Sequence, residues 1–212
     1  DVVAISGGWY HNVALKKDGS VWTWGWDPFG QLGDGSTVSS PTPVRVSGLS
    51  DIAAISAGTL HNLALKKDGT VWSWGWNGFG QLGNGSTAQH NSPVKVSTGT
   101  AFKSVSAGGF HNLAVDQAGN VWGWGWNGFG QVGASGTFNR PLPVKLKAPI
   151  NVEQVSAGYA HSLATGAQGT YAWGWNAFGQ LGDGTIADRP SPIRIGALTD
   201  VRVAYVRHEA LT

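Results

Sequence analysis

A period of 50 residues runs through the chain and constrains its fold more than any other feature. The first 50 residues share 30 identical positions with the next 50 when the two are aligned without gaps. Four histidines show the step most simply: His11, His61, His111 and His161. Repeats of this length are typical of modular β architectures, so the fold follows from what one unit can form.

Each repeat carries the signals of β-strands joined by tight turns. Asp18-Gly19 lies between two runs of alternating residues and Asp68-Gly69 repeats it, which predicts type I′ hairpins. Helical periodicity is absent, and the 33 glycines would destabilise helices. A β-solenoid is the alternative, but its coils are usually shorter and lack the hairpin. The pattern therefore predicts an all-β protein made of β-propeller blades.

The repeat boundaries predict one β-propeller over residues 1–212, with four full blades and a degenerate partial fifth. The full units span 1–50, 51–100, 101–149 and 150–198, and the partial unit spans 199–212. A terminal blade without a neighbour exposes apolar side chains and strand edges. We therefore expect a fragment, or a half-ring closed by self-association with a second copy, rather than a closed four-bladed monomer.

Composition excludes several classes of function. Hydrophobic residues make up 41% of the chain and charged residues 12%, with a net charge of +2 and no basic cluster, which argues against nucleic-acid binding. There is no cysteine, and no apolar run reaches the roughly 20 residues that span a bilayer. We also expect a processed product or a piece of a longer chain, because the sequence has no methionine and residue 1 is therefore not a translation start. The sequence contains no signal peptide.

One string of residues resembles the repeat of the regulator of chromosome condensation family. It reads Gly8-x-x-His11-x-x-Ala14-Leu15, then Asp18-Gly19-x-Val21-x-x-Trp24-Gly25-x-Asp27-x-x-Gly30-Gln31-Leu32-Gly33. Later repeats match more closely, with Asn77, Asn127 and Asn176 where the first has Asp27. The resemblance implies blades of a seven-bladed ring, of which only four and a part are present. It also suggests bacterial-type tandem repeats and an extracellular bacterial setting.

Alternating tryptophans form the centre of each repeat. Trp22, Trp24 and Trp26 alternate, so on one strand they would share a face. Large flat side chains fill the wedge between two blades well, which favours packing as the role of the first two. The residues given this packing role are Trp22, Trp24, Trp72, Trp74, Trp122, Trp124 and Trp173, with Tyr171 near the position of Trp122.

The third tryptophan and the following phenylalanine are the best candidates for contact with a partner. They come where the strand enters a loop, and they return in every repeat: Trp26, Phe29, Trp76, Phe79, Trp126, Phe129, Trp175 and Phe178. The pairs before each histidine differ between repeats and add Trp9, Tyr10, Phe110 and Tyr159. Loops on one face of the ring would present an aromatic surface suited to proteins or sugars. The alternative is that these rings pack loop against loop between blades.

The repeated histidines are interpreted as structural, each hydrogen-bonded to nearby backbone. Equivalent positions on adjacent blades are too far apart to share one metal ion. The Asp34-Gly-Ser-Thr turns lack the spaced acidic ligands of a calcium loop, and no catalytic arrangement of nucleophile, base and acid stands out. We therefore predict no enzyme activity, no catalytic residues, no metal site and no cofactor.

The combined reading is a non-enzymatic scaffold that binds another protein through aromatic-rich loops. Three alternatives stay open: a carbohydrate-binding propeller, a nucleotide-exchange factor for a small GTPase, and a purely structural, self-assembling repeat protein of natural or designed origin. We expect no nucleic-acid partner and no membrane partner.

Overall fold

The computed structural model describes residues 1–149, 151–196 and 198, and the partial repeat expected at 199–212 lies outside them. Sixteen strands form four antiparallel sheets of four, each in sequence order. Blade 1 comprises β1 (Val2–Gly7), β2 (His11–Lys16), β3 (Val21–Gly25) and β4 (Ser40–Arg45). Blade 2 comprises β5 (Ile52–Ala57), β6 (His61–Lys66), β7 (Val71–Gly75) and β8 (His90–Lys95). Blade 3 comprises β9 (Phe102–Ala107), β10 (His111–Asp116), β11 (Val121–Gly125) and β12 (Arg140–Lys145). Blade 4 comprises β13 (Val152–Ala157), β14 (His161–Gly166), β15 (Gly169–Gly174) and β16 (Arg189–Arg194).

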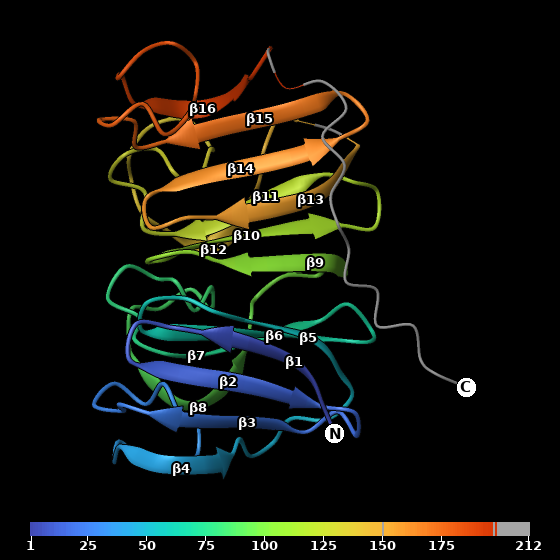
Figure 1. Ribbon diagram of the computed structural model, residues 1–212, viewed down its shortest axis with the longest axis vertical. Coiled ribbons are helices and arrows are strands. Elements are labelled where there is room, and N and C mark those ends of the chain that lie inside the picture. The colour runs from blue at the N-terminus through green and yellow to red at the C-terminus, as the bar shows by residue number, and fades with distance from the viewer. Residues whose placement is uncertain (150, 197, 199–212) are drawn as a thin grey trace.

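The four blades follow one another in an arc, with blade 1 at one end and blade 4 at the other (Figure 1). The first strands of successive blades contact one another, β1 with β5, β5 with β9 and β9 with β13, so they line the inner side of the arc. Each of the four predicted full blades is therefore one four-stranded sheet. The architecture is all-β, as predicted.

The hairpin between the second and third strands has a different turn from the predicted one. A type I′ turn needs positive φ at both central residues, but only Gly19 has it, at 79°. The N–H of Gly19 donates to Lys16 O, and the N–H of Lys16 donates to Ser20 O. This is the three-residue connection, in which a type I turn is followed by a left-handed glycine. The Asp18 carboxylate accepts from the N–H and hydroxyl of Ser20, which explains the aspartate.

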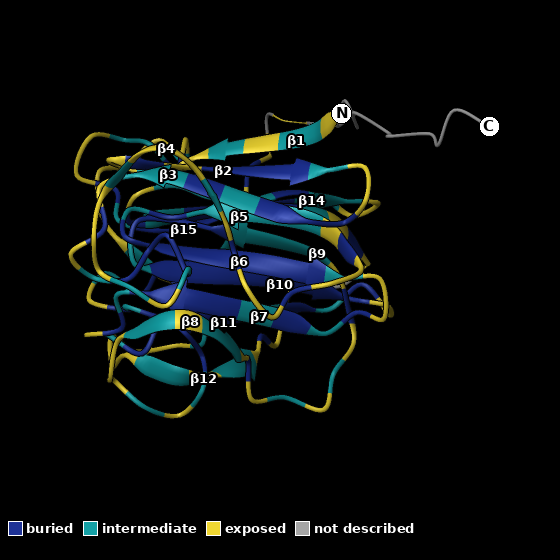
Figure 2. Cartoon of the chain, turned by 90° about the horizontal axis from the view of Figure 1, so that it is seen from below, coloured by how far each residue is buried: buried dark blue, intermediate teal, exposed yellow. Residues whose placement is uncertain are grey.

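Each contact between blades is a small hydrophobic core. At the first junction Val13, Leu15 and Val21 of blade 1 pack against Ala64 and Trp74 of blade 2. The next two junctions repeat this arrangement around Trp124 and Trp173. Figure 2 shows β6 and β10 buried along most of their length, whereas β1 carries exposed positions. Stability is therefore distributed over the junctions, as in other repeat proteins.

The packing role of the alternating tryptophans is confirmed at these junctions. Trp74, Trp124 and Trp173 are fully buried, and each indole N–H donates to a backbone carbonyl of the preceding blade. Trp24 has the same sequence position but is only half-buried, because no described blade packs on its side of blade 1. Burial of these side chains thus depends on a neighbouring blade as well as on the repeat.

Trp26 does not share a face with Trp22 and Trp24, so that prediction was wrong. Strand β3 ends at Gly25, whose φ of 113° breaks the alternation. A Cβ at this glycine would lie 2.4 Å from Tyr10 O, so only glycine fits. The N–H of Trp26 then donates to Tyr10 O, which turns the third tryptophan out of the sheet and into the loop.

Candidate functional site

A short polar network holds each aromatic loop in shape. In the first repeat the N–H of Phe29 donates to the side-chain oxygen of the buried Gln31. The N–H of Leu32 donates to the Asp27 carboxylate. The second, third and fourth repeats make the same glutamine contact at Phe79, Phe129 and Phe178. The loop that carries the phenylalanine is therefore built the same way four times, which fixes the ring relative to its blade.

Within each repeat the third tryptophan meets this phenylalanine edge to face. The ring centroids of Trp26 and Phe29 lie 5.5 Å apart with an interplanar angle of 78°. The equivalent pairs lie 5.0, 5.4 and 5.2 Å apart, again close to perpendicular. This geometry is favourable for aromatic pairs beyond the area they bury.

The pairs of neighbouring repeats also touch, which makes the network continuous. Phe29 lies 6.5 Å from Trp76, Phe79 lies 5.7 Å from Trp126, and Phe129 lies 5.7 Å from Trp175, measured between ring centroids. The residues before the histidines join the same network through Tyr10, Phe110 and Tyr159. All twelve predicted residues therefore form one aromatic belt: Trp9, Tyr10, Trp26, Phe29, Trp76, Phe79, Phe110, Trp126, Phe129, Tyr159, Trp175 and Phe178.

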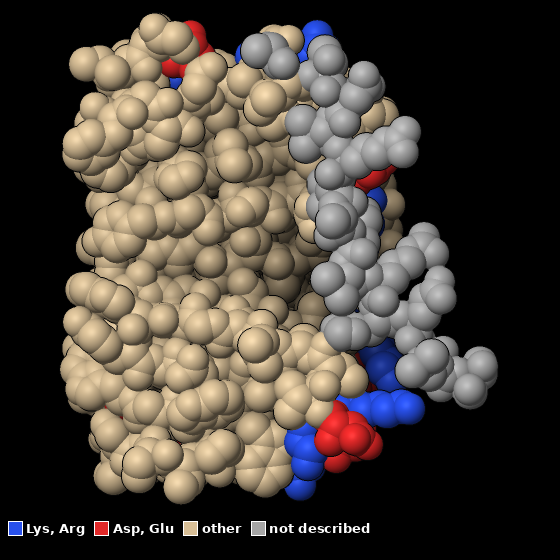
Figure 3. Space-filling view, viewed as in Figure 1, with Lys and Arg blue, Asp and Glu red and all other residues tan. Residues whose placement is uncertain are grey.

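The rings of the belt differ in how far they are buried. Seven rings are half-buried and pack loop against loop, as the alternative interpretation predicts. Five are exposed: Trp9, Tyr10, Trp26, Tyr159 and Phe178, the last at 81%. The belt lies on the side of the blades where β2 begins and β3 ends, which in the view of Figure 3 shows almost no charged side chain. The charges visible there gather on the opposite side, where the Asp-Gly hairpins lie.

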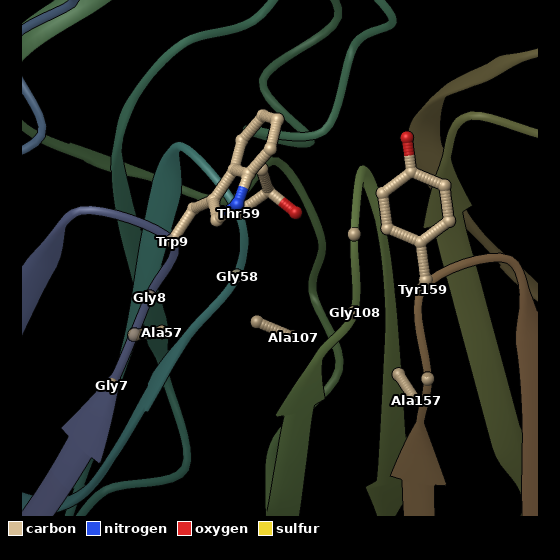
Figure 4. Close-up of a pocket in the computed structure, with 12 residues that line it drawn as sticks. Gly7, Gly8, Trp9, Ala57, Gly58, Thr59, Ala107, Gly108, Ala157 and Tyr159 are labelled. Atoms are coloured by element: carbon tan, nitrogen blue, oxygen red, sulfur yellow. The ribbon is translucent and has the colours of Figure 1, made fainter.

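A groove opens beside the belt at the ends of the innermost strands. Its volume is about 480 Å³, and it is lined by Gly7, Gly8, Ala57 and their equivalents in later blades. Trp9 and Tyr159 rise from opposite sides of it, with Ala107 between them (Figure 4). The backbone N–H of Trp9 donates to the backbone carbonyl of Thr59, which fixes this edge to the next blade. The groove is shaped mainly by small residues and backbone, and Trp9, Thr59 and Tyr159 are the larger side chains that line it.

The repeated histidines lie behind the belt, and their partners differ from the predicted backbone groups. His11 Nε2 lies 2.8 Å from Asn62 Oδ1, and His61 Nε2 lies 2.7 Å from Asn112 Oδ1. An amide oxygen only accepts, so the Nε2–H of the imidazole is the donor. Each bond crosses a junction between blades, because the asparagine belongs to the next repeat. Burial lowers the pKa of His61 to about 4, which leaves the ring neutral at pH 7.

The sequence did not identify the residues that accept these bonds, Asn62, Asn112 and Ser162. The Asn112 side-chain amide also donates to Gln81 O. This asparagine of β10 therefore bonds both to β6, through His61, and to the loop after β7, through Gln81. The signal was present, since an asparagine directly follows the histidine in the first three repeats and Ser162 takes its place in the fourth. Among the described residues there is no group of three or more acidic, histidine or cysteine side chains arranged to hold a metal ion. In the same part of the chain no helix is long and apolar enough to cross a membrane.

The model of the RCC1-like domain family matches residues 1–210. The chain belongs to the RCC1-like domain family. Among solved structures it is similar to yeast RCC1 (Prp20) bound to Kap60, with 28% identity and a TM-score of 0.83, covering 92% of this chain and 48% of that one. Prp20p from Saccharomyces cerevisiae, described with its binding to Gsp1p and histones, shows 29% identity and a TM-score of 0.83, covering 92% and 50%.

Curated relatives match over single repeats. The Arabidopsis thaliana ultraviolet-B receptor UVR8 is 50% identical over 42 residues, which is 20% of this chain and 10% of the receptor. This RCC1-like chain thus spans about half the length of the two yeast structures and a far smaller share of that receptor. The relatives named here come from yeast and a plant, and they do not support the expected bacterial origin.

Proposed function

We propose that the chain is a non-enzymatic scaffold that binds another protein through the aromatic belt. The observation that carries this proposal is the continuity of the belt, with twelve rings from four repeats in one network. Aromatic side chains provide large contact areas with little loss of conformational entropy, and tryptophan and tyrosine are enriched among the residues that dominate binding energy.

The similar yeast proteins support a protein partner over other classes. One was solved bound to Kap60, and another is described as binding Gsp1p and histones. The near absence of charge on the visible part of the belt side favours an apolar, shape-driven contact over phosphate or carboxylate recognition. Exchange activity on a small GTPase would be a special case of the same proposal, in which the bound protein is the GTPase.

Replacing Trp76 and Trp126 by alanine is expected to lower the affinity for a protein bound at the belt by at least about tenfold, because central aromatic residues contribute most of the binding energy of such interfaces. The wild-type chain and this double variant are immobilised side by side. Purified Kap60, Gsp1 and histones are passed over both, followed by a lysate whose retained proteins are then purified and measured individually.

The matched control is Trp22→Ala, which removes a half-buried tryptophan outside the belt. Circular dichroism of all variants checks that the half-buried positions do not simply unfold the chain. Equal retention of every protein by the wild-type and the belt variant would contradict the proposal. Binding on a glycan array, lost in the belt variant, would favour the carbohydrate-binding alternative. Faster GDP release from Gsp1 would specify the partner as a GTPase.

A further inference from the structure

A cleft of about 210 Å³ lies at the outer rim of the junction between blades 3 and 4, and we call it the rim cleft. Blade 3 lines it with Ala134, Ser135, Lys145 and Lys147, and blade 4 lines it with Ser191 of the outermost strand β16. None of the residues that line it belongs to the aromatic belt. Most of these side chains differ from those at the same positions of the other blades, so the cleft is not part of the repeated framework.

Two lysines at the end of β12 project to the same side of blade 3. Lys145 is the last residue of the strand, and Lys147 follows after the buried Leu146. The N–H of Leu146 still donates to Val121 O, so the alternation of the strand continues past its end. Both lysines are exposed, and neither has an ion pair among the described residues. The rim cleft therefore has two positive charges beside it.

The acid that accompanies this lysine position in blade 1 is missing from blade 3. Arg45 occupies the position of Lys145. Hydrogen bonds within the hairpin and, less strongly, nearby positive charges that include Arg45 lower the pKa of Asp18. Blade 3 has Ala118 at the position of that aspartate. The acid that this hairpin does contain, Asp116, is already bonded to groups of its own hairpin. Lys145 thus lacks the carboxylate that lies near its equivalent.

A second missing acid leaves the guanidinium of Arg140 without a carboxylate. In blade 4 the equivalent Arg189 forms an ion pair with Asp183, with 2.6 Å between Nη2 and Oδ2. Blade 3 has Ala134 at the position of that aspartate. Arg140 donates only a long bond of 3.5 Å to Ser135 O, and its buried Nε–H has no partner among the described residues. Its charge lies beside the loop that forms one wall of the rim cleft and adds to the charge of the two lysines.

A serine in the left-handed conformation brings a hydroxyl group to the same cleft. Ser135 has a φ of 59° at a position where the other blades have Gly35, Gly85 and Gly184, and this conformation is unfavourable for serine. The N–H of Gly85 donates across its junction to Pro141 O, whereas the N–H of Ser135 has no partner among the described residues. The Ser135 hydroxyl instead lies 3.3 Å from the hydroxyl of Ser191 in the next blade. Two adjacent hydroxyl groups therefore join the cleft to its charges.

We propose that the rim cleft binds a phosphate group, with Lys145 and Lys147 supplying the charge and the hydroxyls of Ser135 and Ser191 supplying hydrogen bonds. A phosphomonoester carries a charge of about −1.5 to −2 near pH 7 and three strong acceptor oxygens. Two ammonium groups and two hydroxyls match that charge and those oxygens, whereas a carboxylate has about half the charge and one oxygen fewer. The site lies outside the belt, so a bound phosphate leaves the belt open to a protein partner.

An NMR titration of the whole chain with inorganic phosphate at physiological ionic strength tests the site. The amide signal of Ser135 should shift along a saturable curve, and acetate at the same concentrations should shift it much less. A phosphoserine tripeptide is titrated in parallel. Tighter binding of the peptide would identify a phosphorylated protein as the source of the group, and tighter binding of inorganic phosphate would identify the free ion. The proposal is overturned by a Ser135 signal that ignores both phosphates, or that responds equally to acetate.

Removing the two lysine charges tests their role against a matched control. Lys145→Gln/Lys147→Gln should lower the phosphate affinity at least about tenfold, because hydrogen bonds from charged donors are the strong ones. Lys66→Gln/Lys95→Gln removes the same net charge from blade 2, where Asp68 stands at the hairpin, and should leave the affinity within about twofold. Equal losses in the two variants would mean that phosphate responds only to the net charge of the chain, and would overturn the assignment.

Two further variants give blade 3 the residues of the other blades, so they are compatible with the fold. Ala134→Asp places the carboxylate of blade 4 beside Arg140 and in the wall of the cleft, and should abolish phosphate binding. Ser135→Gly removes one hydroxyl and the left-handed serine, so it should lower the phosphate affinity about two- to tenfold while the melting temperature stays equal or rises. Phosphate binding to the Ala134→Asp chain with unchanged affinity would overturn the proposal.

Discussion

Asp27→Asn is expected to stabilise the protein at pH 7 by about 2 kcal/mol, because it removes a buried charge from a site built for an amide. In the other repeats Asn77, Asn127 and Asn176 donate through the side-chain amide to two loop carbonyls. Asp27 is fully buried and keeps only the bond from the Leu32 N–H, while its second oxygen has no partner among the described residues.

The effect of this substitution should depend on pH in a defined direction. Burial raises the pKa of Asp27 to about 6, with a smaller contribution from the charge of Asp34, although the bond from Leu32 opposes the shift. The folded pKa is above the unfolded one, so the folded state holds the proton more tightly and stability falls as pH rises from about 4 to about 6. The advantage of asparagine should be small at pH 4 and complete at pH 7.

Urea denaturation of both proteins from pH 4 to pH 8 measures this difference. Taking the difference between the two proteins cancels the other carboxylates, such as Asp183, whose lowered pKa changes stability in the opposite direction. The reverse change, Asn77→Asp in the second repeat, is the matched control and should introduce the same pH dependence as a loss of stability. An advantage of asparagine that is constant with pH would contradict the buried-charge explanation.

Much of the fold and the membership of the belt were predictable because the same sequence pattern is present in four copies. Equivalent residues of equivalent blades must occupy equivalent places, so the strands and the shared loop positions follow from one unit. The tryptophan and phenylalanine of each loop were identified this way, and the other four belt residues came from the variable pairs before the histidines. The structure brings all twelve together. Their role in binding stays a prediction.

What the period could not supply was the contact between one repeat and the next. It shows that His61 and His111 are equivalent, but not that they reach across the junction to Asn112 and Ser162 of the following blades. It gave Trp24 and Trp74 the same environment, yet only Trp74 is fully buried. It also missed that the positive φ of Gly25 sends Trp26 out of the strand, since φ is set by local geometry that alternation does not encode.

Asn112→Ala is expected to cost about 1–3 kcal/mol of folding stability, because it leaves the buried Nε2–H of His61 without an acceptor and removes one of the two donors to Gln81 O. The side chain is fully buried between blades 2 and 3. Its oxygen accepts from His61 Nε2, and its amide donates to Gln81 O, which the Trp124 N–H also contacts. Removing the asparagine leaves the Nε2–H of the buried His61 without an acceptor.

The repeat supplies the control, because Asn12 has the same neighbours in sequence but no blade of the described residues packs against it. Asn12→Ala should change stability by less than about 0.5 kcal/mol, because this side chain is exposed. The double variant His61→Ala/Asn112→Ala should be less destabilised than the sum of the two single variants, since the second change removes the stranded donor. Equal losses for Asn112→Ala and Asn12→Ala would mean that the asparagine acts within its own blade. A large loss confined to Asn112→Ala would instead identify the His-Asn-Gln contact as the bond that orders one blade against the next.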